Sequence, residues 1–531
     1  MPTCRIRSAR LRALFITALA LFAVGALILR VAQLADRPLH GDEANQAHRA
    51  GILIETGVYK YDPVEHHGPT LYYLTLPLAL LRGQHTFADT DEYTFRLVPA
   101  LFGVALVLLL IPVADGLGKS AALWAAAFTA LSPAFVYYSR YYIQETLLVA
   151  FTFAAIACAW RYLQRPRAAW AVGFGAAIGL MHATKETCVL AWFAMAVAAA
   201  PIALVQLRAA RRAEAASPPL DRRVLARHAA LAVLVALIVS VVLFSSFFTH
   251  AAGPLDSVRA YFPYLHRASA DPAAGGDAHA HNHPWPYYLR LLLYTRRAPG
   301  PWWSEALILG LAAVGVVAAW RPRQPRVLPR FLAIYAPVLA AVYAVIPYKT
   351  PWCLLSFHHG FILLAGFGAV ALIRLARLAP LRIAVAILIA LATLQLGRQA
   401  VNAAFEYPAD PRNPYVYAHT ASAHLRLVQR MHDLAAVHPD GRALRVHVIT
   451  PDGDYWPLPF YLRSFTQVGY FTVQPERPDA DVLIVASSIA DAVQQRLTGD
   501  YHVEHGSLRP GVLLRVYIRT QLWDAFMNTR R

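Results

Sequence analysis

The chain of 531 residues is 57% hydrophobic and 15% charged, whereas a soluble protein carries about 25% charged residues. Its apolar residues form blocks of about 20, the length of a helix that spans a bilayer, so the composition excludes an ordinary soluble protein and indicates a polytopic membrane protein. The formal net charge of +18 does not indicate nucleic-acid binding, because arginines gather in short linkers between apolar blocks and no basic stretch is interleaved with aromatic residues.

The first apolar run follows a basic N-terminal tail. It extends from Ala13 to Leu29 and continues to Leu34 after a single Arg30. A secretory signal peptide has a similar beginning, but no small-residue cleavage site follows this run. We therefore expect a retained first span with the N-terminus on the cytoplasmic side.

Hydropathy and charge together predict the threading of the rest of the chain. The expected spans are 13–34, 97–115, 120–138, 146–163, 168–184, 187–207, 229–248, 304–320, 330–347, 356–374 and 383–401. With this threading, the arginine-rich linkers fall on the cytoplasmic side, as the positive-inside rule requires.

Whether the apolar segment 71–83 crosses the membrane determines on which side every later loop lies. A helix of about 12 residues reaches about 18 Å, less than the hydrocarbon core of about 30 Å. We therefore expect residues 35–96 to form a first outer loop, with segment 71–83 lying in the interface. Residues 249–303 then form a second, histidine-rich outer loop.

The composition changes after residue 401. Segments 445–450 and 481–488 are typical of strands and segment 423–437 of a helix. The predicted fold is thus a polytopic α-helical membrane protein with about 11 or more spans in residues 1–401, followed by a small α/β extracytoplasmic domain in residues 402–531.

Asp42 and Glu43 form an acidic pair in the first outer loop. A carboxylate at a membrane surface can act as a general base toward an acceptor hydroxyl or amine, and its neighbour can hold a metal or the acceptor. Asp42 can equally cap the helix that follows it. The sequence by itself leaves both interpretations open.

Acidic and imidazole side chains in the two outer loops are candidate metal ligands. They are Glu65, His66 and His67 in the first loop, and His281 and His283 in the second. Interfacial histidines that bind no metal are the alternative, so a divalent metal ion is left open.

Ionisable residues at the outer ends of spans are functional candidates by default. Arg140 and Glu145 open one predicted span, Lys185 lies in a hairpin between two spans, and Lys349 lies between two prolines in PYKTPW. Lys349 can bind a lipid phosphate as a point charge. The alternatives are a simple turn at Lys185 and an interfacial anchor at Lys349.

Several motifs together resemble the glycosyltransferase-C superfamily, in particular the protein O-mannosyltransferases and the aminoarabinose transferases of lipid A. The motifs are the acidic pair, the HGP turn followed by LYY, RLVPALFG at 96–103 and the Lys-Thr-Pro segment at 349–351. YDPVEHHGPTLYYL, YYSRYYIQE and DYWPLPFYLRS are also similar to a prokaryotic flippase-associated family.

The resemblance implies a membrane glycosyltransferase that takes a sugar from a polyprenyl-phosphate donor and transfers it to a lipid, glycan or protein acceptor. Asp42 would be the catalytic base, with Glu43 assisting and Glu145 as a further catalytic candidate. Lys349, Arg140 and Lys185 are the candidates for the donor phosphate. His67 stands where the family often has a lysine, which weakens a phosphate-binding role for this turn.

The same resemblance implies an active site on the outer side of the cytoplasmic membrane, among membrane lipids. Transport of a lipid-linked sugar is the alternative function. It would predict ionisable residues near the midplane of several spans and an internal repeat, and the sequence shows few of the former and no obvious repeat.

Overall fold

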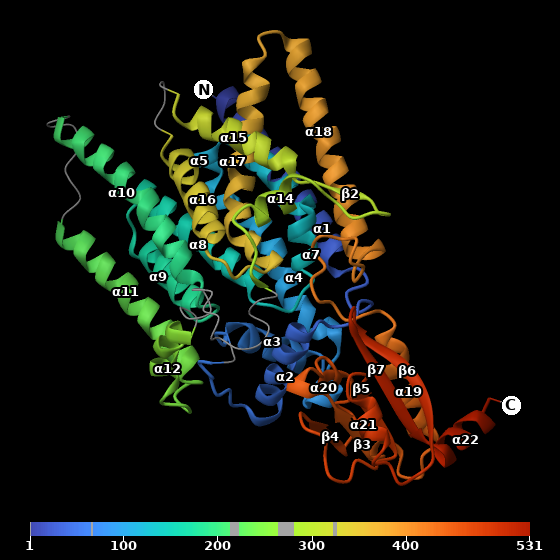
Figure 1. Ribbon diagram of the computed structural model, residues 1–531. Helices are drawn as coiled ribbons and strands as arrows, with labels where there is room; N and C mark the ends of the chain where they lie inside the picture. Colours follow the sequence, from blue (N-terminus) through green and yellow to red (C-terminus); the bar gives the residue numbers. More distant parts are fainter. Residues whose placement is uncertain (1, 65–66, 213–221, 264–280, 322–325, 531) are drawn as a thin grey trace.

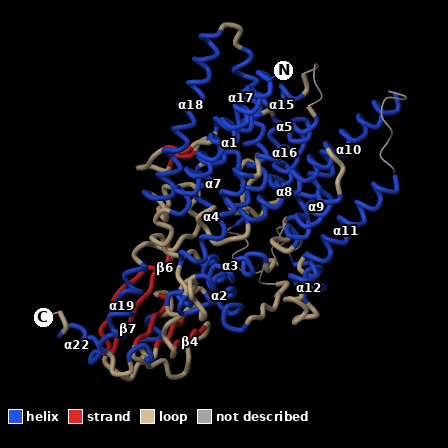
Figure 2. Tube along the Cα trace, turned by 180° about the vertical axis from the view of Figure 1, so that it is seen from behind, coloured by secondary structure: helices blue, strands red, loops and turns tan. Residues whose placement is uncertain are grey.

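The computed structural model describes residues 2–64, 67–212, 222–263, 281–321 and 326–530. A bundle of helices forms most of the molecule, and a small sheet domain lies at one end of it (Figures 1 and 2). The N-terminus and the connection from α17 to α18 lie at the opposite end of the bundle (Figure 1).

Ten long or apolar helices follow the predicted spans closely. They are α1 (Pro2–Val31), α4 (Glu92–Leu108), α8 (Glu145–Gln164), α9 (Ala168–His182), α10 (Cys188–Arg212), α11 (Arg222–Phe244), α15 (Ala306–Ala319), α16 (Val327–Val345), α17 (Leu355–Leu375) and α18 (Ala379–Val401). Among the described residues, eight helices are long and apolar enough to cross a membrane, and α9 and α15 are shorter. The predicted class of polytopic helical membrane protein is confirmed.

The predicted span 120–138 is not one helix. It is divided into α6 (Lys119–Leu131) and α7 (Pro133–Tyr138). Pro133 lacks an N–H and disfavours a helical conformation at the residue before it, and Ser132 accordingly has ψ near 123°. Ser132 then caps α7, since its hydroxyl accepts a hydrogen bond from the main-chain N–H of Phe135 at 3.4 Å.

Shorter elements connect the spans. They are α2 (Gly41–Thr56), α3 (Thr70–Leu81), η1 (Phe87–Asp89), η2 (Ile111–Val113), α5 (Ala114–Leu117), α12 (Gly253–Arg259), α14 (Tyr287–Leu293), the antiparallel pair β1 (Thr295–Arg296) and β2 (Trp302–Trp303), η4 (Pro351–Leu354) and η5 (Asn402–Glu406). Helix α3 has 12 residues and coincides with the apolar segment that was predicted to be too short to span.

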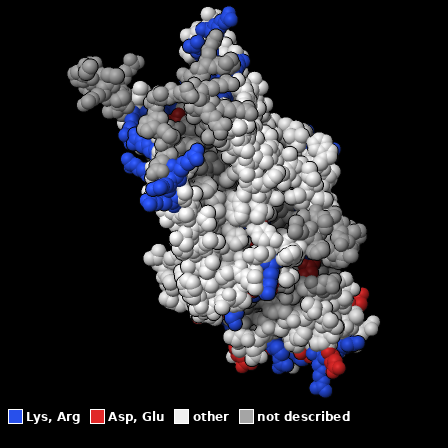
Figure 3. Space-filling model, turned by 90° about the vertical axis from the view of Figure 1, so that its left-hand side faces the viewer, with Lys and Arg blue, Asp and Glu red and all other residues white. Residues whose placement is uncertain are grey.

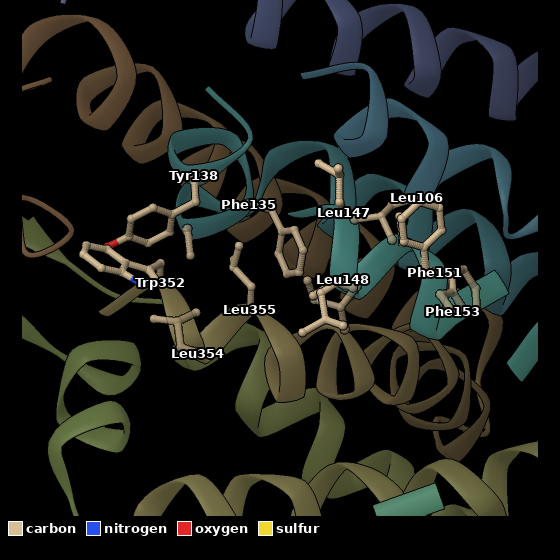
Figure 4. Close-up of a cluster of buried hydrophobic side chains, with 14 of the residues drawn as sticks. Leu106, Phe135, Tyr138, Leu147, Leu148, Phe151, Phe153, Trp352, Leu354 and Leu355 are labelled. Atoms are coloured by element: carbon tan, nitrogen blue, oxygen red, sulfur yellow. The ribbon is translucent and has the colours of Figure 1, made fainter. Parts of the chain in front are cut away.

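Large apolar side chains fill the centre of the bundle. Those of α4, α7, α8 and α17 meet in one cluster, in which Phe135 lies between Leu147, Leu148 and Leu355 (Figure 4). Helices α9 and α11 approach closely at Gly175, where an added Cβ would lie 2.2 Å from the main-chain oxygen of Ala232. The glycine therefore permits direct contact between the two helix backbones.

The space-filling view shows the charge pattern of a membrane protein. Lysine and arginine side chains gather near one end of the visible face, and a broad uncharged belt separates them from the charges around the sheet domain (Figure 3). Such a belt matches the apolar surface that lipid tails require, and it supports an integral membrane protein.

The C-terminal domain is a five-stranded mixed sheet in the order β4-β3-β5-β7-β6. The strands are β3 (Val446–Ile449), β4 (Val468–Phe471), β5 (Val482–Ala486), β6 (Tyr501–Arg509) and β7 (Val512–Arg519). Strand β3 pairs in parallel with β4 and β5, whereas β7 is antiparallel to β5 and β6.

Both faces of this sheet are covered. The helices are α19 (His424–Val437), η6 (Gly441–Ala443), η7 (Pro451–Gly453), α20 (Leu458–Tyr461), α21 (Ala490–Gln494) and α22 (Thr520–Asn528). Alternate residues of β5 pack against opposite clusters, Ile484 with α19 and α22 and Leu483 with α21. Burial on both faces explains why β5 reads as a continuous apolar run.

Candidate functional site

A cavity of about 340 Å³ lies where α2, α8, α10 and α16 meet the turns before α10 and α17. Its polar lining residues are Asp42, Asn45, Gln46, His67, Gln144, Glu145, Lys185, Glu186, Thr187 and Thr350. The other lining residues are mostly apolar or aromatic: Ile143, Val189, Leu190, Tyr261, Tyr343, Ile346, Tyr348, Trp352 and Cys353. The cavity therefore offers partners for both a charged group and an apolar chain.

Asp42 is held in the first turn of α2. His40 is the N-cap of this helix, and its Nδ1 accepts a hydrogen bond from the main-chain N–H of Asp42 at 3.0 Å. The side chain of Asp42 is 53% exposed and lines the cavity. His40, and not Asp42, is therefore the cap of α2, and the carboxylate of Asp42 lines the cavity.

Glu43 has a different environment from its neighbour. It is fully buried, and its carboxylate accepts hydrogen bonds from the guanidinium groups of Arg37 and Arg96 at 2.8 to 2.9 Å. Burial alone would raise the pKa of Glu43, but the two guanidinium groups lower it to about 2. Glu43 does not line the cavity. The structure therefore does not place it beside Asp42 in the cavity, where an assisting catalytic residue was expected.

Glu145 and Lys185 form a buried ion pair in the cavity wall. Glu145 begins α8, and Lys185 lies in the turn between α9 and α10. The second carboxylate oxygen of Glu145 is buried and makes no hydrogen bond within the described part of the chain. The pair brings together two candidates that the sequence placed in separate loops.

Glu186 and His67 form a second pair beside the first. Nδ1 of His67 lies 2.8 Å from the carboxylate of Glu186, whose other oxygen accepts a hydrogen bond from Tyr61 at 3.0 Å. Burial would raise the pKa of Glu186, but the nearby His67 lowers it. The turn that contains His67 packs closely against the chain at residue 183. An added Cβ on Gly68 would lie only 2.2 Å from the main-chain oxygen of Ala183.

Arg140 is not in the cavity, contrary to the position expected for a donor-phosphate ligand. Its guanidinium group donates hydrogen bonds to four main-chain oxygens in and just after the last turn of α1, at 2.6 to 3.2 Å. Those oxygens belong to Leu29, Arg30, Ala32 and Gln33. A cation at the C-terminal end of a helix satisfies carbonyl groups that the helix leaves unpaired, so Arg140 has a structural role in this conformation.

Lys349 is also used by the fold. Its ammonium group donates to the main-chain oxygens of His283, at 2.9 Å, and Ile346, and its main-chain N–H donates to His281 at 2.9 Å. Lys349 does not line the cavity, although its neighbours Tyr348 and Thr350 do. In this conformation Lys349 thus joins the segment at 281–283 to the chain just before η4.

The three predicted metal ligands that the structure describes each have another partner. Nδ1 of His281 lies 2.6 Å from the hydroxyl of Tyr417, the ring of His283 stacks on Tyr287, and His67 pairs with Glu186. Glu65 and His66 lie outside the described residues. Within the described ranges, no three His, Cys, Asp or Glu side chains converge on a position that could hold a metal ion.

Polar groups outside the predicted set of site residues surround the candidates. Gln46 and Gln144 both line the cavity, and the amide of Gln144 donates to Gln46 at 2.9 Å. Arg96, which holds Glu43, stands in the motif RLVPALFG. An arginine among apolar residues near the start of a span is costly unless paired, and this signal could have identified it.

The chain is similar to polytopic membrane glycosyltransferases, in sequence over part of its length and in fold over nearly all of it. A family model described as dolichyl-phosphate-mannose-protein mannosyltransferase matches residues 72–253. No curated protein matches the chain in sequence. The family model and the shared fold described below confirm the predicted resemblance to the glycosyltransferase-C superfamily and indicate a glycosyltransferase.

Particular solved structures share the fold over nearly the whole chain. ArnT from Cupriavidus metallidurans bound to undecaprenyl phosphate has a TM-score of 0.60 and 16% identity, over 95% of this chain and 98% of ArnT. The oligosaccharyltransferase AglB from Archaeoglobus fulgidus, in complex with an inhibitory peptide and a dolichol-phosphate, has a TM-score of 0.58 and 14% identity, over 97% and 75%.

An oligosaccharyltransferase from Archaeoglobus fulgidus in complex with zinc and sulfate has a TM-score of 0.52 and 14% identity. The match covers 96% of this chain and 73% of the relative. At these sequence identities, the structural similarity establishes the fold of this chain. One of the similar structures contains a bound metal ion.

Proposed function

We propose that this protein transfers a sugar from a polyprenyl-phosphate donor to an acceptor at the extracytoplasmic face of the cytoplasmic membrane. One observation carries the proposal. The exposed carboxylate of Asp42 and the Glu145–Lys185 pair line the same cavity, together with apolar and aromatic side chains. The undecaprenyl phosphate bound to ArnT and the dolichol-phosphate bound to AglB support this donor class.

The parts of the donor match the parts of the cavity. The lipid chain would follow the apolar wall at Val189, Leu190 and Ile346, and the phosphate would lie near Lys185. A cation at this position offsets the charge that develops on the departing phosphate. Lys185 therefore takes the phosphate-binding role that the sequence also offered to Lys349 and Arg140.

In the transfer step, the acceptor attacks the anomeric carbon from the side opposite the departing phosphate. Asp42 takes the proton from the acceptor hydroxyl or amine while the acceptor atom forms a bond to the anomeric carbon. The bond from that carbon to the phosphate oxygen breaks, and its electron pair leaves with the polyprenyl phosphate. In-line displacement inverts the anomeric centre.

Glu145 contributes in two ways in this proposal. One carboxylate oxygen holds Lys185 in place, and the other, which is buried in the cavity wall, offers an acceptor for a sugar hydroxyl. The predicted metal ligands do not converge within the described part of the chain, and the transfer step is therefore assigned to these side chains without routing it through a metal.

The test uses purified protein in proteoliposomes with a panel of radiolabelled undecaprenyl-phosphate monosaccharides and a cell-envelope extract as the acceptor source. The proposal predicts release of free undecaprenyl phosphate together with labelled acceptor in equal amounts. Movement of intact donor across the bilayer without cleavage of the sugar–phosphate bond would contradict the proposal and favour a transporter.

A further inference from the structure

We infer that the part of the chain after residue 401 positions Asp42, by holding the main chain of residues 39–41 from two separate segments. The inference rests on the proposed role of Asp42 as base. Because the Asp42 side chain is 53% exposed, its location relative to the cavity depends on the main chain of the first turn of α2. Helix α20 lies beside α2, between it and the strands of the C-terminal sheet (Figure 1).

Both main-chain polar groups of Leu39 are bound by side chains from this part of the chain. Its N–H donates to the hydroxyl oxygen of Tyr461 at 2.8 Å, and its carbonyl oxygen accepts a hydrogen bond from the hydroxyl of Thr420 at 2.6 Å. Leu39, Thr420 and Tyr461 are all buried. Leaving a buried main-chain group without a hydrogen-bond partner is unfavourable in free energy, so these two bonds restrain the chain just before α2.

His40 makes a third connection through its imidazole ring. Its Nδ1 accepts from the N–H of Asp42 at 3.0 Å, and its Nε2 lies 3.0 Å from the main-chain oxygen of Tyr417. An accepting Nδ1 requires the proton on Nε2, which therefore donates to Tyr417. One neutral ring thus joins the main chain of Asp42 to the segment that leads into the sheet domain.

Packing reinforces these three bonds. A Cβ on Gly41 would lie 3.5 Å from the Cβ of Trp456, so the start of α2 is in close contact with the chain just before α20. The ring of Phe460 in α20 packs edge-on against Phe87, which belongs to the same segment 35–96 as α2. The start of α2 therefore packs directly against the C-terminal part of the chain.

The account makes Thr420 and Tyr461 positioning residues. Neither residue is among those that line the cavity, and both hydroxyls bind the main chain of Leu39, through which they act. Displacement of a reacting group by about 1 Å can reduce a rate by about 100-fold, so loss of either hydrogen bond is expected to lower kcat more than it changes the KM for the donor.

Two variants of the full-length protein test the inference, Tyr461→Phe and Thr420→Val, which each remove one hydroxyl with little change in shape. Thr420→Ser restores the hydroxyl and should rescue its site. Tyr470→Phe is the matched control, because Tyr470 packs on Tyr455 within the sheet domain. Amide hydrogen exchange of residues 39–46 and steady-state transfer from undecaprenyl-phosphate sugar are measured for each protein.

The expected result is faster exchange at residues 39–46 in Tyr461→Phe and Thr420→Val, with wild-type exchange in Thr420→Ser and Tyr470→Phe. The kcat should fall by about fivefold to 100-fold in the first two variants, with a donor KM within about twofold of wild type. Unchanged exchange in both hydroxyl-deletion variants would overturn the inference, whatever the activity. Altered exchange with an unchanged kcat would equally overturn it.

The exchange measurement separates this inference from the proposed function. If the wild type transferred no sugar, the proposed function would fail, while exchange at residues 39–46 would still report whether the C-terminal part of the chain holds α2. Unfolding of a variant as a whole would appear as faster exchange in the strands β3 and β5, which the inference predicts to keep wild-type exchange.

Discussion

Replacement of Glu43 by glutamine should strongly destabilise the protein at neutral pH. The carboxylate of Glu43 accepts hydrogen bonds from two nitrogens of Arg96, one nitrogen of Arg37 and the main-chain N–H groups of His40 and Tyr142. Glutamine keeps one acceptor oxygen and replaces the other with an NH₂ group, which faces donors. Buried donors are then left unpaired next to two guanidinium groups whose counter-charge is gone.

The size of the effect follows from the same environment. The pKa of Glu43 falls from 4.5 to about 2 in the folded protein, and one pKa unit corresponds to about 1.4 kcal/mol. This gives about 3 kcal/mol, in line with the loss of about 3–5 kcal/mol when one partner of a buried ion pair is removed. Glu92→Gln, at the start of α4, is the control.

The pH dependence has a defined sign. Because the folded pKa of Glu43 is depressed, its contribution to stability is fully present above the unfolded pKa and is lost as pH falls from about 4.5 to about 2. Thermal unfolding in detergent should show a gap in Tm between wild type and Glu43→Gln that is constant near neutral pH and narrows below about pH 4.5. Equal Tm values at pH 7, or an undiminished gap at about pH 3, would refute the reasoning.

Three further outcomes are expected. Lys185→Gln should lower kcat/KM for the donor by about 10- to 100-fold in the transfer assay, and an unchanged value would remove Lys185 from the phosphate site. Arg140→Gln should lower the Tm and leave the donor KM unchanged, because Arg140 binds main-chain oxygens after α1. A raised donor KM with a wild-type Tm would instead indicate that Arg140 binds the donor. Gly68→Ala should destabilise the protein, since its Cβ would collide with the main chain at 183, whereas Gly310→Ala, with open space around the Cβ, should be neutral or stabilising by up to about 1 kcal/mol; equal Tm values for the two variants would contradict this.

Much of the fold was predictable because the membrane imposes a simple physical rule. Main-chain groups must be paired within each segment that crosses the hydrocarbon, so apolar runs such as 146–163 and 356–374 coincide with helices α8 and α17. The span 120–138 was predicted as one helix because its hydropathy is continuous. Its division at Ser132 depends on a local effect of Pro133 that hydropathy does not register.

The C-terminal sheet was predicted in kind but not in order. The predicted strand segments at 445–450 and 481–488 correspond to β3 and β5, which are largely buried in the sheet. The partners of these strands come from segments separated by tens of residues, and local patterns contain no information on such pairing.

The candidate site was harder to predict because partners are chosen in three dimensions. Asp42 and Glu43 are adjacent in sequence, yet one faces the cavity and the other is enclosed by Arg37 and Arg96. Lys349 and Arg140 had the expected charge, but nearby carbonyl groups bind them in the fold. Charge type was readable from the sequence, whereas the partner of each charge was not.

The role of Asp42 is the central claim, and a single-turnover rate tests it most directly. Donor cleavage by Asp42→Asn at saturating undecaprenyl-phosphate sugar is compared with wild type and with Asp36→Asn, an exposed aspartate of the same loop outside the cavity. The account predicts a loss of about 100- to 10,000-fold in Asp42→Asn, the range that a general base contributes, with a wild-type rate in Asp36→Asn. A wild-type rate in Asp42→Asn would contradict the account.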